Sequence, residues 1–212
     1  MNENTPQRPG RISRRQFCAA TAATAGGLAG AGWLHAAEAE NAGSSQSSAD
    51  RPPAEAQIDI HTHLGQPYNK RGPLTPKMLL EWMDAHSIAR AVVLPLISPE
   101  SWFYTMDSGW VIEQCAASDR LIPFCDIDPR NSYMGSQGAV RDLLQRYIEA
   151  GARGLGEHKC GVPIDHSGNL RIFRVCSELK LPILYHMDSA RNTDAPGLPG
   201  LEKAVQAAPA SL

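Results

Sequence analysis

The sequence lacks the features that mark several large classes of protein. Basic residues are not in excess, because 20 Lys and Arg stand against 22 Asp and Glu, for a formal net charge of -2. There is no basic stripe interleaved with aromatic residues, so we expect no nucleic-acid partner. The one extended apolar stretch is short and interrupted by glycine, whereas a membrane-spanning helix needs roughly 20 apolar residues. We therefore expect no stable membrane span.

Cysteine is also scarce, and its spacing is wide. Of the five cysteines, Cys18 lies near the N-terminus, and the others are Cys115, Cys125, Cys160 and Cys176, with no CxxC pair. An even number of cysteines in an oxidising compartment permits disulfides. However, 42% of the residues are hydrophobic, enough for the chain to build a core without covalent links. We predict four buried free thiols.

The first 39 residues have the layout of an export signal. The basic residues at the start are Arg8, Arg11, Arg14 and Arg15. An Ala/Gly-rich run from Phe17 to about Trp33 follows, and then the small-residue cleavage site Ala37-Glu38-Ala39. The stretch SRRQFC at 13–18 resembles a twin-arginine export motif. The other interpretation is a disordered basic tail followed by an ordinary helix.

The export interpretation predicts the signal peptide, the translocase and the final location, and the composition of the next segment predicts a linker. Residues 1–39 are a twin-arginine signal peptide, and the twin-arginine translocase is a partner during export. The mature protein is periplasmic or extracellular after cleavage near Ala39. Residues 40–56 are rich in Ser, Ala and Pro without an apolar period, which predicts a flexible linker.

From Gln57 to Leu212, segments typical of strands and of helices alternate. The expected strands are 57–61, 90–96, 121–126, 152–157 and 182–187. The expected helices are about 75–86, 101–118 with Ser101 as its cap, 136–150, 170–179 and 198–207. Five strand–helix units in succession predict an α/β fold with a parallel sheet.

The loops that follow the strands are long and polar, as in 64–74, 158–169 and 188–197, whereas the links that follow the helices are short. Barrels and open α/β sheets both place their active sites at the carboxyl ends of the strands, where these long loops gather. A complete (β/α)₈ barrel takes about 250 residues. The five units therefore predict either part of a barrel or a smaller open sheet.

The most informative local pattern is Asp59-Ile60-His61-Thr62-His63, at the end of the first expected strand. Side chains alternate across a strand, so Asp59, His61 and His63 are expected on one side. Two imidazoles on one side can hold a borderline metal ion such as Zn²⁺. Chance and core histidines also produce such pairs, but the position before a long Gly/Pro loop favours metal binding.

This strand-one HxH, preceded by Asp59 and followed by Gly65, resembles the amidohydrolase superfamily, and specifically its amidohydrolase-related group. The resemblance implies a TIM (β/α)₈ barrel of the metal-dependent hydrolase type, here truncated after about five βα units. Its site is completed by Glu or Lys from strand four, His from strands five and six, and Asp from strand eight. That Asp, the general base, is expected beyond Leu212, so the 212-residue chain itself is expected to be incomplete and inactive.

Two of the later positions have counterparts here. GARGLGEHK at 151–159 resembles the strand-four segment and carries Glu157, while LPILYH at 181–186 resembles strand five and ends in His186. The implied metal ligands are His61, His63, Glu157 and His186. Lys159, on the same side of the strand as Glu157, is the alternative ligand. Glu157 as a surface carboxylate and His186 as a core histidine are the competing interpretations.

The predicted function follows from this ligand set. We expect a hydrolase that uses metal-activated water on an amide, ester or lactone-type bond of a small-molecule substrate, with one or two divalent ions, zinc foremost. Asp188 and Arg191, in the loop after strand five, are candidate substrate contacts. The alternatives are a non-oxidative decarboxylase of the same family, which commonly lacks the strand-four ligand, and a non-catalytic exported metal-binding domain.

Overall fold

The computed structural model describes residues 57–67, 71–101 and 104–211. The predicted signal peptide 1–39 and linker 40–56 lie outside the described residues and stay predictions. None of the helices in the described part of the chain is long and apolar enough to cross a membrane.

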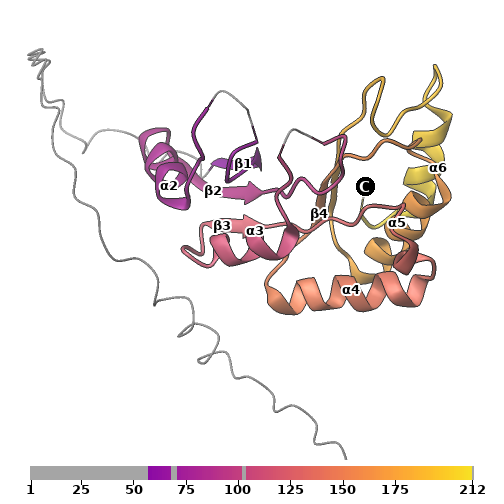
Figure 1. Cartoon of the computed structure of the whole chain (residues 1–212), viewed down its shortest axis with the longest axis horizontal. Helices are drawn as coiled ribbons and strands as arrows, with labels where there is room; N and C mark the ends of the chain where they lie inside the picture. The colour runs from indigo at the N-terminus through magenta and orange to yellow at the C-terminus, as the bar shows by residue number, and fades with distance from the viewer. Residues whose placement is uncertain (1–56, 68–70, 102–103, 212) are drawn as a thin grey trace, which may run out of the picture. The chain divides into compact units, whose positions relative to one another are not determined.

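Five parallel strands form the centre of the fold (Figure 1). The strands β1 (Gln57–Thr62), β2 (Ile88–Val93) and β3 (Leu121–Pro123) form one sheet, and β4 (Leu155–His158) pairs with β5 (Ile183–Tyr185). A parallel bridge between Cys125 and Leu155 joins the two groups. The strands thus follow one another in sequence order without the reversal that marks a doubly wound open sheet.

A helix follows each strand, as the alternating pattern predicts. These helices are α2 (Pro76–Ala85), α3 (Ser108–Cys115), α4 (Gln137–Ala150), α5 (Ser167–Leu179) and α6 (Pro199–Ala207), and a short 3₁₀ helix, η1 (Ser132–Met134), precedes α4. The Thr75 hydroxyl accepts a hydrogen bond from the Met78 N–H at the start of α2. Ser136 caps α4 in the same way through the Ala139 N–H. Hydroxyl caps of this kind satisfy N–H groups that the first turn leaves unpaired.

Two helix boundaries differ from the prediction. The expected start of a helix at Ser101 is wrong, because α3 begins at Ser108 and its cap is Asp107, whose carboxylate accepts from two backbone N–H groups. Ser101 is buried instead and donates to the Lys159 carbonyl at 2.8 Å. The helix α5 begins at Ser167 rather than at Leu170, with His166 as its cap. The strands β3 and β5 are each three residues long, shorter than expected.

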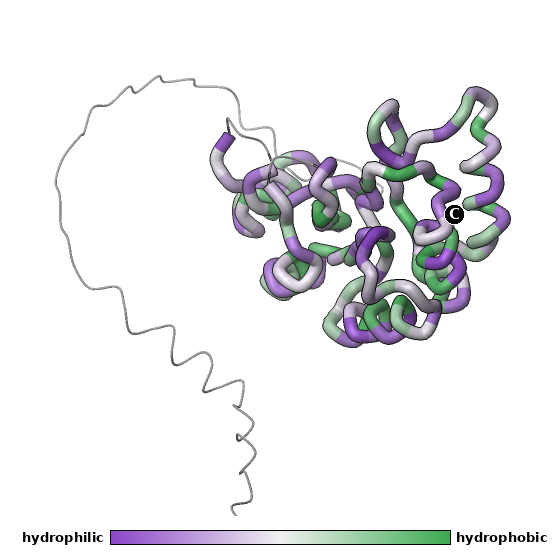
Figure 2. The backbone as a smooth tube through the Cα atoms, turned by 45° about the vertical axis from the view of Figure 1, so that its right-hand side comes forward, coloured by the Kyte–Doolittle hydropathy of each residue, from purple (hydrophilic) through white to green (hydrophobic). Residues whose placement is uncertain are grey.

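Apolar side chains pack the helices onto the sheet. Phe173 of α5, Leu144 of α4 and Leu155 of β4 are fully buried in the larger cluster, and Met83 of α2 belongs to a second cluster that includes residues of β2 and α3. Hydrophobic and hydrophilic segments accordingly alternate along the helices (Figure 2). Cys115, Cys125, Cys160 and Cys176 are all buried and free, which confirms the prediction of unpaired thiols.

Candidate metal centre

The four predicted metal ligands meet at the carboxyl ends of three strands. His61 lies on β1 and His63 directly after it, Glu157 lies on β4, and His186 follows β5. The Oε2 atom of Glu157 is 3.4 Å from Nε2 of His61 and 3.3 Å from Nε2 of His63. Its Oε1 atom is 3.1 Å from Nδ1 of His186. Side chains that are distant in the sequence thus converge on one carboxylate.

The geometry around Glu157 fits a bound cation. The Glu157 side chain is only 1% exposed, and its Oε2 atom has no hydrogen-bond partner although it faces two imidazole nitrogens. A buried carboxylate oxygen without a partner is costly, so a cation at this point would satisfy it. Single ligand atoms of His61, His63 and Glu157 all lie within 4.8 Å of one another. Two imidazole nitrogens and a carboxylate oxygen are a donor set suited to zinc.

The backbone before Glu157 depends on glycine. Gly156 has a φ of +131°, a conformation that side chains disfavour, and a Cβ atom at this position would run into the Leu184 carbonyl of β5. The absence of a side chain lets β4 and β5 approach closely. This approach brings Glu157 and His186 within reach of each other.

The tautomer of His63 is set by the backbone. Its Nδ1 atom lies 2.9 Å from the Leu94 carbonyl oxygen, which only accepts hydrogen bonds, so Nδ1 carries the proton. In the neutral ring, Nε2 is then the atom left with a lone pair for a cation between His63 and Glu157. Metal-binding histidines are held in this way by a hydrogen bond on the other ring nitrogen.

The charges around Glu157 change the pKa values of the site. Burial alone would raise the pKa of Glu157, but the approach of His61 and His63 and the charge of Lys159 bring it well below its usual range. The close Glu157 carboxylate in turn raises the pKa of His61, against the opposing effect of burial. Glu157 is therefore ionised at neutral pH, the form that binds a metal.

The ring of His186 is oriented by the turn that follows β5. Its Nε2 atom lies 2.8 Å from Oδ2 of Asp188, and that carboxylate accepts further bonds from the Arg191 side chain and from two backbone N–H groups. This arrangement leaves His186 Nδ1 facing Glu157. Asp188 and Arg191 are thus engaged in holding His186, and their role as substrate contacts stays a prediction.

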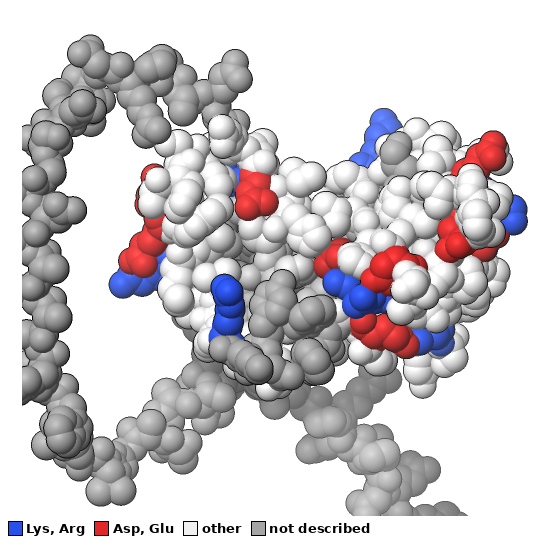
Figure 3. Space-filling model, turned by 90° about the horizontal axis from the view of Figure 1, so that it is seen from above, with Lys and Arg blue, Asp and Glu red and all other residues white. Residues whose placement is uncertain are grey.

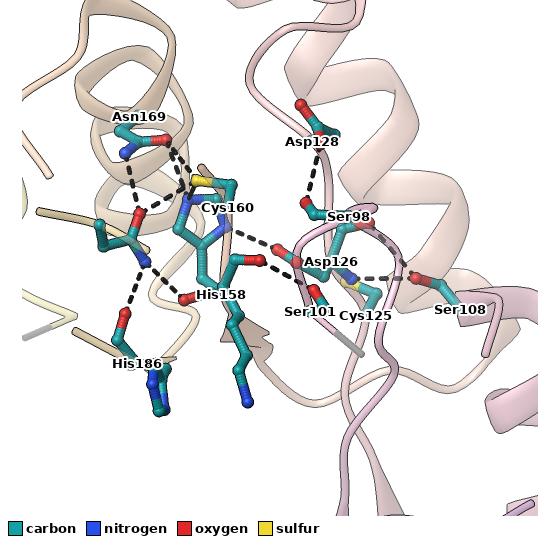
Figure 4. Close-up of polar contacts among 12 residues, drawn as sticks. Ser98, Ser101, Ser108, Cys125, Asp126, Asp128, His158, Cys160, Asn169 and His186 are labelled. Carbon is teal, nitrogen blue, oxygen red and sulfur yellow. Dashed lines mark hydrogen bonds and ion pairs between the residues drawn. The ribbon is translucent and has the colours of Figure 1, made fainter. Parts of the chain in front are cut away.

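Lys159 and His158 point to opposite sides of β4, as strand alternation predicts. The Lys159 Nζ atom is 3.4 Å from Oε1 of Glu157, which keeps Lys159 at the site as an ion-pair partner, while its role as an alternative ligand stays a prediction. His158 is fully buried behind the site, with Nδ1 2.8 Å from Asp126 and Nε2 2.9 Å from Asn169 (Figure 4).

A pocket of about 710 Å³ borders the two histidines of β1. Besides His61 and His63, the described residues that line it include Leu74, Met78 and Trp82 and the cation Arg71. A mainly apolar pocket with a few polar groups is the usual form of a small-molecule site. The pocket can thus receive the non-reacting part of a small substrate beside the candidate metal centre.

Charged side chains on the loops after β2 and β3 are paired. Arg130 binds Glu100 through two hydrogen bonds of 2.7 and 2.8 Å and also binds Asp128, which accepts from the Ser98 hydroxyl. Acidic and basic side chains accordingly lie interspersed on the face shown in Figure 3. This network ties together the two loops beside the site.

Asp128 makes stability depend on pH. Burial would raise the pKa of its carboxyl, but hydrogen bonds from Arg130 and Ser98 lower it to about 2, below the roughly 3.9 of an unfolded aspartate. Its contribution, about 1 kcal/mol after solvent screening, is complete above pH 4 or so and is lost as the pH falls towards 2. We expect urea unfolding to show that Asp128→Asn destabilises the protein at pH 6 and that the difference from wild type shrinks by pH 3. A difference that stays constant with pH would contradict this.

The chain is similar to known proteins in structure, and not detectably in sequence. No family model matches the sequence, and no curated protein matches it either. An uncharacterised TIM-barrel protein from Bordetella bronchiseptica superposes with a TM-score of 0.52 at 12% identity, over 74% of this chain and 64% of that one. A putative 2-pyrone-4,6-dicarboxylic acid hydrolase from Pseudomonas putida superposes with a TM-score of 0.50 at 15% identity, over 74% of this chain and 55% of that one.

The fold is that of a TIM barrel. The chain spans 64% and 55% of the lengths of these two proteins, which agrees with the prediction of a barrel truncated after about five βα units. TIM-barrel enzymes place their active sites at the carboxyl ends of the strands. His61, His63, Glu157 and His186 all lie at this end of the barrel.

The prediction from sequence missed several polar residues near the site. Asp126, Asn169 and Asn192 are buried and hydrogen-bonded in one network behind β4. Asp126 is the last residue of the third expected strand, 121–126, and the strand pattern assigns it no role. A polar residue at the end of an apolar strand was the one available signal, and Asn169 and Asn192 carry no local signature.

Proposed function

We propose that the chain is part of a metal-dependent hydrolase of the amidohydrolase superfamily, in its amidohydrolase-related group. The observation that supports this is the convergence of His61, His63 and His186 on the buried carboxylate of Glu157. The substrate is a small molecule with an amide, ester or lactone-type bond. The pocket beside His61 and His63 holds its non-reacting part.

His61, His63, Glu157 and His186 would hold a divalent ion, zinc foremost, which would supply Lewis-acid polarisation of a carbonyl group and a water of lowered pKa, about 7. Glu157 supplies the negative charge that offsets the charge of the ion. His63 and His186 are oriented by the Leu94 carbonyl and by Asp188, so their free nitrogens face the site without rearrangement. The general base implied by the family resemblance, an aspartate after strand eight, stays a prediction.

The other two candidate functions have less support. Non-oxidative decarboxylases of this family commonly lack the strand-four ligand, whereas Glu157 stands at the centre of the histidine cluster. A non-catalytic exported metal-binding domain would have the same cluster without turnover, so activity separates it from the hydrolase.

We also propose that the protein is exported through the twin-arginine translocase and reaches the periplasm or the extracellular space after cleavage near Ala39. The basic start, the apolar run and the small-residue site within residues 1–39 support this. Export of an already folded protein suits a metal site that is loaded in the cytoplasm.

The metal site is tested by zinc titration of the full chain. We expect wild type to bind zinc and His63→Ala to bind it about 100-fold more weakly. Loss of a residue that only orients a metal ligand already weakens metal binding 10–100-fold, and His63 is itself a proposed ligand. His86→Ala is the matched control, since His86 is exposed directly after the last residue of α2 and contacts Trp82. Equal affinities of His63→Ala and wild type would contradict the proposed site.

Activity is then measured on the zinc-loaded protein with a panel of esters, amides, lactones and carboxylated aromatic compounds. Hydrolysis supports the proposal, whereas release of CO₂ from the aromatic acids supports the decarboxylase. Zinc binding without turnover of any compound supports the non-catalytic domain or a chain that needs further strands of the barrel.

A further inference from the structure

The turn after β5 contains a second residue, besides Asp188, whose side chain holds the site in place. Asn192, at the end of this turn, is fully buried although it belongs to a polar loop. Its φ of +43° lies in the left-handed region, which asparagine tolerates better than most residues. Its backbone N–H donates to the Cys160 carbonyl at 2.8 Å, which fixes the turn against the segment after β4.

The side-chain amide of Asn192 binds both strands that carry ligands. Its Nδ2 atom donates to the His158 carbonyl at 2.7 Å and to the His186 carbonyl at 2.9 Å. An amide nitrogen has two hydrogens, so each hydrogen has its own acceptor. One acceptor belongs to the residue next to Glu157, and the other belongs to His186 itself.

The amide oxygen of Asn192 is held as well. Its Oδ1 atom accepts from the Cys160 thiol at 3.0 Å and from the Asn169 amide at 3.3 Å. Both ends of the side chain are therefore committed, and the amide has no freedom to turn. An aspartate would present oxygen to two carbonyl oxygens, so the position requires the amide.

These hydrogen bonds fix the distance between two candidate ligands, Glu157 and His186. The backbone bond from His186 N–H to the His158 carbonyl, 3.0 Å long, already joins β4 to β5 at this level. Asn192 adds a cross-link to the same His158 carbonyl and to the His186 carbonyl. A slide or separation of the strand ends would change the 3.1 Å distance between Glu157 Oε1 and His186 Nδ1.

We propose that Asn192 is a positioning residue that fixes the spacing of Glu157 and His186 and so sets the metal affinity of the site. The inference rests on the proposed function, because it assumes that a cation binds there. It assigns Asn192 no contact with the cation or with substrate. Residues that hold metal ligands typically contribute 10–100-fold to affinity.

The test compares Asn192→Ala with Asn169→Ala in the full chain. Asn169 is also a fully buried asparagine and makes hydrogen bonds to His158, Pro163 and Ile164. It also donates to Asn192 Oδ1 but makes no bond to the strand-end carbonyls, so its removal leaves both Asn192 donor bonds in place. Both variants lose thermal stability. Zinc titration well below the unfolding temperature should show 10–100-fold weaker binding for Asn192→Ala and no more than about a threefold change for Asn169→Ala.

A spectroscopic measurement separates positioning from general loosening of the fold. Co²⁺ bound in place of zinc reports ligand geometry through its visible absorption, which we expect to change in Asn192→Ala and to stay that of wild type in Asn169→Ala. If Asn192→Ala binds zinc within threefold of wild type with an unchanged Co²⁺ spectrum, the inference is wrong. If wild type itself binds no zinc, it is the proposed function that fails.

The wild-type protein provides a second measurement in case Asn192→Ala does not fold. In ¹⁵N NMR spectra, the side-chain NH₂ signals of Asn192 should shift and exchange more slowly with solvent when zinc is added, because both acceptors lie on strand ends that a bound ion would link through Glu157 and His186. The NH₂ signals of Asn169 should change less. Unchanged Asn192 signals at saturating zinc would overturn the inference.

Discussion

Glu157→Gln is expected to weaken zinc binding about 1,000-fold while the protein remains folded. The carboxylate of Glu157 lies within 3.4 Å of all three histidines of the site. The substitution keeps the shape but removes the negative charge. Loss of one partner from a buried ionic contact costs about 3–5 kcal/mol, and about 4 kcal/mol corresponds to 1,000-fold in affinity.

The measurement is competition for zinc against a chromophoric chelator, together with thermal unfolding with and without zinc. A ligand that binds only the folded state raises its stability, so zinc should stabilise wild type and leave Glu157→Gln nearly unchanged. Glu81→Gln is the control, because Glu81 is exposed on α2. If Glu157→Gln binds zinc as wild type does while Lys159→Ala does not, Lys159 takes the place of Glu157 as ligand.

The parts of the fold that could be predicted have strong local patterns. Alternating strands and helices predict the five parallel units, and the alternation of side chains along β4 correctly places Glu157 and Lys159 on one side and His158 on the other. The histidines at the ends of β1 and β5 could be assigned to one site because the carboxyl ends of parallel strands gather at one face.

Other features depended on contacts that are distant in sequence. Ser101 and Asp107 are both suitable helix caps, and the local sequence does not decide between them. The structure uses Asp107, while Ser101 binds the Lys159 carbonyl across the face of the barrel. Asp188 and Arg191 have the polar character of substrate contacts, yet in the structure they hold His186.

The buried polar network was the largest omission. Asp126, Asn169 and Asn192 come from the segment after β3, from α5 and from the turn after β5, so no pattern in the sequence relates them. The sequence around a single polar residue does not show whether that residue is buried or exposed to solvent. Asp126, Asn169 and Asn192 come into one hydrogen-bonded network only when β3, β4 and β5 lie side by side in the fold.

This network leads to the largest expected effect on stability. Asp126→Ala should lower the free energy of unfolding by about 3–5 kcal/mol. The side chains of Asp126 and His158 are 1% and 0% exposed, with 2.8 Å between Oδ1 and Nδ1. Burial alone would lower the pKa of His158, but the Asp126 carboxylate raises it well above its usual value. Removing Asp126 leaves a buried imidazole without its anionic partner.

Urea unfolding of Asp126→Ala, His158→Leu and the double variant measures this coupling. The double variant should lose less than the sum of the two single losses, because removing both partners leaves no buried charge. Asp119→Ala is the control, an exposed carboxylate expected to change stability by no more than about 0.5 kcal/mol. If Asp126→Ala changes stability as little as the control, or if the losses simply add, the pair does not hold β4 between β3 and α5.

Zinc affinity, measured on the same variants, separates residues that stabilise the fold from residues that bind the metal. His158 is adjacent to Glu157 but faces away from the site, so the ionic pair with Asp126 acts on the backbone of β4 and not on the ligands directly. Asp126→Ala is therefore expected to lower stability more than zinc affinity, whereas Glu157→Gln is expected to do the opposite. This opposite order separates the residues that support the barrel from the residue that binds the metal.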